Sequence, residues 1–235
     1  MVRTRRTPTE ALVDQGRQLL GWFADLDVAD ASRPTVLEGW DVHAVLAHLD
    51  LGLQRTVGGL GPEPGSAEGS RRRALDHADR FAYGALLDRV DEALERLDGA
   101  PLPPDVVGPA VVELVVHADD LTRSLPDRDP APQAKPAIGV ACRTLAGVLG
   151  TRYPGRSVEV RIPPHAAVQI SVLRDGRLDP GPTHTRGTPP NVVETDATTF
   201  LRMATGRTTW ADALATGVVA ASGLRADLSE MLPLW

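Results

Sequence analysis

In the first half of the chain, apolar residues recur every three or four positions, and only the second half adds shorter segments in which they recur every second position. The first helical segment opens on the Thr-Pro-Thr-Glu run at 7–10, which supplies a threonine N-cap, a proline in the first turn and a glutamate to complete a capping box. Asp41 is suited to cap a second helix with apolar residues as far as Leu53. Further helical periods cover 71–97 and 109–125. Four such segments predict a helical bundle.

The pattern changes after a proline-rich stretch, Pro126–Pro136, which holds four prolines in eleven residues and has no apolar period. Such a composition is typical of an interdomain linker. We therefore predict a helical domain over 1–127, a linker over 128–136 and a second domain over 137–235.

The second domain mixes helical and strand periods. The pair Asp175-Gly176 closes one alternating run and predicts a tight turn after a strand. Gly206 and Gly217 are placed to end two helices. These features predict an α+β fold. The expected elements are a helix over 137–149, strands over 157–162, 168–173, 191–194 and 218–221, and helices over 196–204 and 209–215.

Bulk composition narrows the classes of function. Hydrophobic residues make up 42% of the 235, which is enough for two modest cores. A formal net charge of -6 repels nucleic acid and anionic lipid, so neither is an expected partner. The single cysteine, Cys142, excludes an internal disulfide. Because no secretory signal and no membrane-spanning run is visible either, we expect a cytoplasmic protein.

Three residues of the helical domain carry candidate chemistry: His48 in the second helix, and Glu113 and His117 in the fourth. Glu113 and His117 are four positions apart and therefore share one helix face. Their apolar surroundings make a carboxylate costly to bury unless a cation or hydrogen bonds compensate for it. A histidine from a neighbouring helix can complete a three-ligand metal site with an open position. A Glu–His salt bridge, and for His48 a hydrogen-bonded core histidine, are the alternatives.

Two aspartates are placed to support these ligands. Asp120 lies one turn beyond His117, and Asp50 lies two positions past His48. For Asp50, a carboxylate on the helix surface is at least as good an interpretation. His43 lies on another side of the same helix as His48 and is not expected in the site. Two imidazoles and one carboxylate leave a bound zinc with a positive charge, so water or a thiol at its open position loses a proton more readily.

The segments around these residues resemble a known family. Residues 39–49, which include Trp40 and His48, look like the Trp-to-His signature of the mycothiol-dependent maleylpyruvate isomerase family, a branch of the DinB-like four-helix bundles. Residues 113–121 resemble the second metal motif of that family. Its C-terminal domain, which is similar to sterol carrier proteins, is resembled by residues 186–196, 205–210 and 221–228.

The resemblance implies a DinB-like metal-binding four-helix bundle followed by a small sterol-carrier-like α+β domain. The family's His, Glu and His ligands match His48, Glu113 and His117. Zinc or another divalent metal is the implied cofactor, with mycothiol as the thiol that occupies its open position. The implied activity is isomerisation or S-transfer on a small electrophilic organic acid.

Arg225 matches an arginine of the family that faces the active site, and the resemblance implies that it binds a substrate carboxylate. An ion pair with Asp227 or Glu230 is the alternative. Two other functions also stay open: a carrier of lipids or small apolar ligands, and a hydrolase that uses metal-bound water. The sequence makes no prediction of the oligomeric state.

Overall fold

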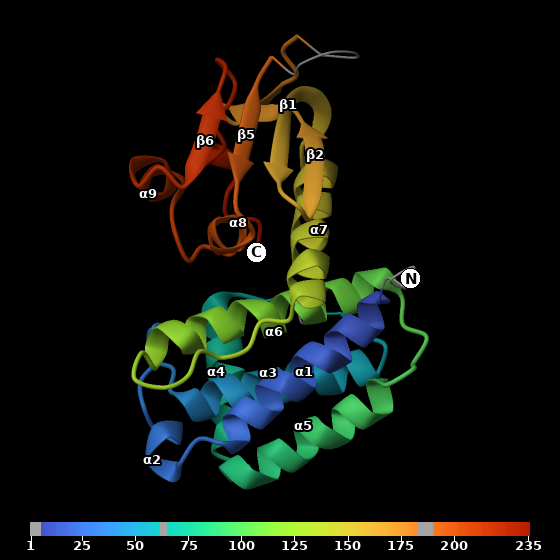
Figure 1. Ribbon diagram of the computed structural model, residues 1–235, viewed down its shortest axis with the longest axis vertical. Helices are drawn as coiled ribbons and strands as arrows, with labels where there is room; N and C mark the ends of the chain where they lie inside the picture. The colour runs from blue at the N-terminus through green and yellow to red at the C-terminus, as the bar shows by residue number, and fades with distance from the viewer. Residues whose placement is uncertain (1–5, 62–64, 183–189) are drawn as a thin grey trace. The chain divides into compact units, whose positions relative to one another are not determined.

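The computed structural model describes residues 6–61, 65–182 and 190–235. They divide into two compact units, a helical one over Met1–Val140 and a smaller one over Ala141–Trp235. Figure 1 shows helices alone in the first unit, and strands together with helices in the second. The predicted class, a helical bundle followed by an α+β domain, is confirmed. Within the described ranges, no helix combines the length and the apolar character that crossing a membrane requires.

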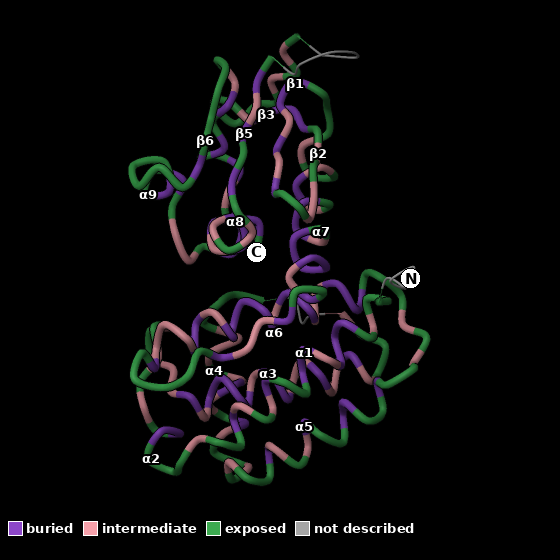
Figure 2. Tube along the Cα trace, in the orientation of Figure 1, coloured by how far each residue is buried: buried purple, intermediate pink, exposed green. Residues whose placement is uncertain are grey.

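Four helices of the first unit form a closed ring around its core. Helix α1 packs on α5 and α6, and α3 packs on the same two neighbours, while α4 lies against α3. Figure 2 shows buried positions along these helices where they face one another. The helices are α1 (Pro8–Ala24), α2 (Val28–Ala31), α3 (Val42–Val57), α4 (Ala67–Ala78), α5 (Tyr83–Leu97), α6 (Pro104–Ser124) and α7 (Lys135–Arg152), the last of which runs into the second unit.

The helix starts follow the predicted capping chemistry. The Thr7 side chain accepts a hydrogen bond from the Glu10 amide, and the Glu10 carboxylate accepts one from the Thr7 amide, so the capping box is complete. The Asp41 carboxylate accepts from the Ala44 amide at 2.7 Å. A similar box between Asp27 and Asp30 starts α2, a short helix that the apolar pattern did not predict.

The prediction of one helix over 71–97 is wrong, because the chain bends between α4 and α5. Phe81 lies at the bend, with its ring centroid 4.8 Å from that of His77 and 4.5 Å from the guanidinium carbon of Arg89. Both of those residues reach the buried carboxylate of Asp50. No glycine or proline marks the bend, so the sequence pattern gave no sign of it.

Helix α6 begins five residues before the predicted start at Pro109. The extra N-terminal turn of α6 is stabilised because Val106 and Val107 are buried. Pro104 lies in this first turn, where a backbone N–H would have no partner within the helix, so the lack of one costs nothing. Pro109 itself sits inside the helix and lacks the N–H that would otherwise donate to the Asp105 carbonyl.

The segment predicted as a linker is attached to the helical unit before α7 begins at Lys135. The buried Gln15 side chain donates to the Pro132 carbonyl and accepts from the Ala134 amide, each at 2.7 Å. The Trp22 indole donates to the Asp129 carbonyl at 2.8 Å. These bonds give the proline-rich backbone partners that it cannot supply for itself.

The second unit is built on a four-stranded sheet of order β2-β1-β5-β6, in which only the β1–β5 pair is parallel. Strands β3 and β4 form a separate hairpin around the predicted turn, where Asp175 and Gly176 have φ values of 51° and 68°. The predicted strand over 168–173 divides at Ser171 into β2 and β3. The elements are β1 (Pro154–Ile162), β2 (Ala166–Ile170), β3 (Val172–Arg174), β4 (Arg177–Asp179), β5 (Val192–Thr195), α8 (Ala197–Ala204), α9 (Trp210–Ala215), β6 (Val219–Ser222) and the 3-10 turn η1 (Ser229–Met231).

Candidate metal centre

Two helices of the ring supply the three predicted ligands. Helix α3 carries His48 next to the buried Leu49, and α6 carries Glu113 and His117 one turn apart. Because α3 and α6 pack directly on each other, residues separated by 65 positions in the sequence come into contact. The apolar stripes that build the bundle therefore also set the position of the site.

The side chains converge on one point. Nε2 of His48 lies 3.1 Å from Oε2 of Glu113, and Nε2 of His117 lies 3.2 Å from the same oxygen. One ligand atom from each residue lies within 4.8 Å of the others, and among the described residues no further His, Cys, Asp or Glu joins the group. Ligands about 2.1 Å from a tetrahedral ion stand roughly 3.4 Å apart, so this spacing suits a divalent cation.

The group is shielded on one side and accessible on the other. The His117 side chain is 6% exposed, whereas those of His48 and Glu113 are 21% and 24% exposed. Solvent therefore reaches the site past His48 and Glu113. A cation held by these three ligands would keep an approach open for a fourth.

Mutual hydrogen bonding shifts the protonation of the pair on α6. Burial raises the pKa of the Glu113 carboxyl, but hydrogen bonds from His117 and His48 outweigh burial, and the pKa lies well below its ordinary value. Burial lowers the pKa of His117, but Asp120 and Glu113 reverse that effect, and the pKa lies above its ordinary value of 6.5. Both shifts therefore favour the charged forms of the pair, a carboxylate at Glu113 and an imidazolium at His117.

Asp120 lies next to His117, on the side of the ring away from Glu113. Its fully buried carboxylate places Oδ2 3.1 Å from Nδ1 of His117, although the direction of approach is poor for a hydrogen bond. Arg123 donates to the other carboxylate oxygen at 2.6 Å. The contact with Asp120 leaves Nε2 as the ring nitrogen that faces Glu113.

The other predicted support, Asp50, does not contact His48. Its carboxylate is fully buried and lies 2.7 Å from both Nε2 of His77 and Nε of Arg89, and it accepts from Gln54 at 3.1 Å. This second polar cluster joins α3, α4 and α5. Its members are far apart in the chain and have no ligand spacing, so no sequence pattern predicts this cluster.

His43 stays outside the site, as its position on α3 predicts. Its Nε2 lies 3.0 Å from the Phe81 carbonyl oxygen, and its ring meets that of Tyr83 edge to face with centroids 5.7 Å apart. His43 and His48 therefore lie on one helix with different surroundings. This contrast makes His43 a matched control for the ligand.

Trp40 forms a wall of the site, a role that the sequence analysis did not assign. Its ring centroid lies 5.4 Å from that of His48 and 6.3 Å from that of His117. The loop that carries Trp40 is tied to α6, because Ser124 accepts from the Val36 amide at 2.9 Å and donates to the Asp120 carbonyl at 2.6 Å. The sequence feature that could have indicated this role is the position of Trp40 directly before the helix cap Asp41.

Arg225 lies in the second unit and pairs with neither of its predicted alternatives. Its Nε donates to the carboxylate of Asp179 at 3.1 Å. Asp227 accepts from the Ser229 amide, and Glu230 accepts from the amides of the Asp175-Gly176 turn. Part of the 186–196 run that resembles the family, residues 186–189, lies outside the described ranges.

Comparison with solved structures finds likeness over nearly the whole chain. A crystal structure of the mycothiol-dependent maleylpyruvate isomerase is 17% identical, with 92% of this chain and 91% of that chain covered and a TM-score of 0.51. A mutant of that isomerase, with one histidine changed to alanine, is 18% identical with the same coverage and a TM-score of 0.52. These similarities establish a shared fold. No curated protein matches the chain.

Family models match both units. Residues 134–234 match the model described as bacterial SCP ortholog. Residues 12–141, more than half of the chain, match the model described as mycothiol maleylpyruvate isomerase N-terminal domain. With the order of motifs and the fold in agreement, the chain belongs to the mycothiol maleylpyruvate isomerase family.

Proposed function

We propose that the chain is a metal- and mycothiol-dependent enzyme that carries out isomerisation or S-transfer on a small electrophilic organic acid. The observation that carries this proposal is the convergence of His48, Glu113 and His117 on one partly open site. The solved relatives are named as mycothiol-dependent maleylpyruvate isomerases, which favours mycothiol as the thiol and maleylpyruvate as the first substrate to test.

The donor set suits zinc. Two imidazole nitrogens and one carboxylate oxygen are common zinc ligands, and their spacing accommodates a tetrahedral ion with one position left for an exogenous ligand. A zinc ion bound there would lower the pKa of a thiol at its open position and so supply a thiolate near neutral pH.

The chain's own residues then have distinct roles. His48 and His117 present Nε2, and Glu113 supplies the negative charge that offsets part of the charge of the cation. Asp120 orients the His117 ring, and the Trp40 indole shields the two imidazoles from water on one side. Arg225 is proposed to bind a carboxylate of the substrate.

Turnover with a matched pair of histidine variants tests this function. Zinc-loaded protein is assayed with mycothiol and maleylpyruvate, and then with other small electrophiles. We expect thiol-dependent turnover that falls by about a hundredfold or more in His48→Gln, since a metal ligand is lost, and that persists in His43→Gln. Absence of thiol-dependent turnover with every electrophile rejects the proposal, and turnover without thiol indicates hydrolysis instead.

A second candidate, a carrier of lipids or small apolar ligands, is favoured by the match of residues 134–234 to bacterial SCP ortholog. A carrier would displace a fluorescent lipid probe with high affinity, and chelators would not change that affinity. The enzyme proposed above would show weak displacement at most.

A further inference from the structure

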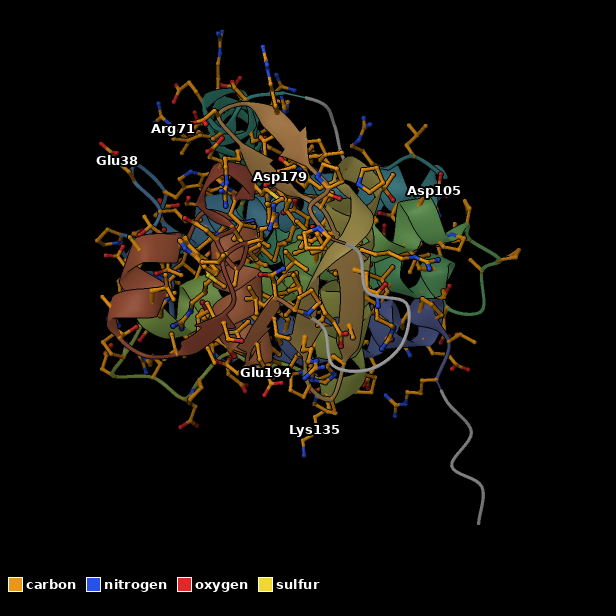
Figure 3. The ribbon with its side chains drawn as sticks, turned by 90° about the horizontal axis from the view of Figure 1, so that it is seen from above. Glu38, Arg71, Asp105, Lys135, Asp179 and Glu194 are labelled. Atoms are coloured by element: carbon orange, nitrogen blue, oxygen red, sulfur yellow. The ribbon has the colours of Figure 1, made fainter. Side chains whose placement is uncertain are left out.

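The contact between Asp179 and Arg225 is built more firmly than a surface ion pair. Asp179 is the last residue of β4, and each of its carboxylate oxygens accepts a different hydrogen bond. Oδ1 accepts from the Gly181 amide at 3.0 Å, and Oδ2 accepts from Nε of Arg225 at 3.1 Å. Both side chains are about three-quarters removed from solvent, at 25% and 26% exposure. Asp179 is labelled in Figure 3. A shielded carboxylate that is itself anchored can hold a guanidinium in one orientation.

Gly181 makes room for this arrangement. Its backbone has φ of 50°, and a Cβ added there would lie 2.2 Å from Nε of Arg225, closer than any side chain can approach. The guanidinium therefore lies directly over the backbone at Gly181. Only glycine satisfies both the left-handed conformation and the close approach.

The backbone that carries Arg225 is fixed from two sides. The Arg225 amide donates to the Asn191 side chain at 3.0 Å, and Asn191 in turn donates to the Ser157 carbonyl of β1 at 2.7 Å. Arg174 donates to the Leu224 carbonyl at 3.1 Å. The start of the Arg225 side chain is thus tied to the sheet while Asp179 holds its Nε.

The terminal nitrogens of Arg225 have no hydrogen-bond partner within the ranges that the structure describes. Among the described residues, none accepts a hydrogen bond from Nη1 or Nη2, so the pair with Asp179 uses one edge of the guanidinium and leaves its fork unpaired. We propose that Asp179, with the space provided by Gly181, positions the Arg225 fork to bind a carboxylate in bidentate fashion. This inference deepens the proposed function and rests on the role given there to Arg225.

The opposite role for Asp179 makes a contrary prediction. If Asp179 only neutralised Arg225, removing its charge would strengthen the binding of an anion. If Asp179 positions Arg225, the same change frees the guanidinium to rotate and weakens binding, although the local charge becomes more positive. The sign of the change therefore separates the two roles.

The test is a titration of the intact chain with maleate, a small dicarboxylate. Binding is monitored through the NMR signal of the Arg225 Nε–H group, and this signal is assigned by its disappearance in Arg225→Lys. We expect Asp179→Asn to weaken maleate binding by about tenfold, the effect of losing one charge-assisted hydrogen bond. Asp227→Asn removes the same charge from an exposed site that does not touch the guanidinium, and it should change the affinity by less than about twofold.

A second variant guards against misfolding. Gly181→Ala keeps the charge of Asp179 but fills the space under the guanidinium, and it should also weaken maleate binding. Unchanged or tighter binding in folded Asp179→Asn overturns the proposal, and so does a wild-type Arg225 signal that does not respond to maleate. Because the titration needs neither thiol nor turnover, failure of the proposed enzymatic reaction would be seen separately.

Discussion

At the scale of single residues, the site depends on how the charges on α6 are shared. His117 lies between two carboxylates, Glu113 and Asp120, which together keep its imidazole protonated to higher pH than usual. Arg123 donates to Oδ1 of Asp120, while Oδ2 of the same carboxylate faces the His117 ring. The negative charge of Asp120 is therefore shared between the guanidinium and the imidazole. A zinc ion requires neutral His117 and must therefore displace this proton.

This competition gives zinc binding a pH dependence. The raised pKa of His117 stabilises the metal-free fold below pH 6.5, and that stabilisation is lost as the pH rises through the raised value. The zinc affinity of the folded protein should accordingly increase with pH as long as the pH lies below the raised pKa of His117, by up to about tenfold per pH unit for each proton released, and level off above that pKa. Competition with a chelator at a series of pH values measures this, and an affinity that is constant through the range contradicts the account.

At the scale of helices, the bundle is held by apolar stripes and by one buried polar cluster. Asp50 on α3 binds His77 on α4 and Arg89 on α5, with Gln54 completing its shell. The cluster connects three helices through the face of α3 that lies opposite His48, since Asp50 is two positions further along the helix. Removing the buried Asp50 carboxylate would leave the buried His77 ring and the Arg89 guanidinium without this compensating charge.

The Asp50→Ala change should therefore destabilise the protein by about 3 kcal/mol, near the lower end for a broken buried pair because Arg89 is one-third exposed. The exposed carboxylate of Asp88, beside Arg89 in the sequence, provides the comparison, and Asp88→Ala should cost less than about 0.5 kcal/mol. Urea unfolding of both variants gives the two free energies. Equal losses would show that the cluster adds nothing beyond a surface charge.

Helical segments with a clear cap were predictable from the sequence, and those shaped by distant contacts were not. Asp41 caps α3 because its carboxylate bonds to a local amide, and such chemistry is visible in the sequence. The bend at Phe81 depends on contacts with residues brought together by the fold, and no local residue marks it. For the same reason the ligand spacing of Glu113 with His117 was visible, whereas the partner of Arg225 was not.

At the scale of the whole molecule, the chain consists of two compact units that contain different candidate site residues. The helical unit contains the three candidate ligands, their support in Asp120 and the wall formed by Trp40. The second unit contains Arg225 and the residues that fix it. The candidate metal ligands and the arginine proposed to bind the substrate therefore belong to different units of the chain.

Zinc titration of the metal-free, folded protein by calorimetry is the most direct test of the central claim that His48, Glu113 and His117 bind one divalent cation. We expect one zinc per chain in the wild type. In Glu113→Gln we expect the zinc affinity to fall by more than the roughly 10- to 100-fold that is typical when a residue beside a metal ligand is changed. Folded wild-type protein that binds no zinc, or a Glu113→Gln variant that binds it equally well, would contradict the account.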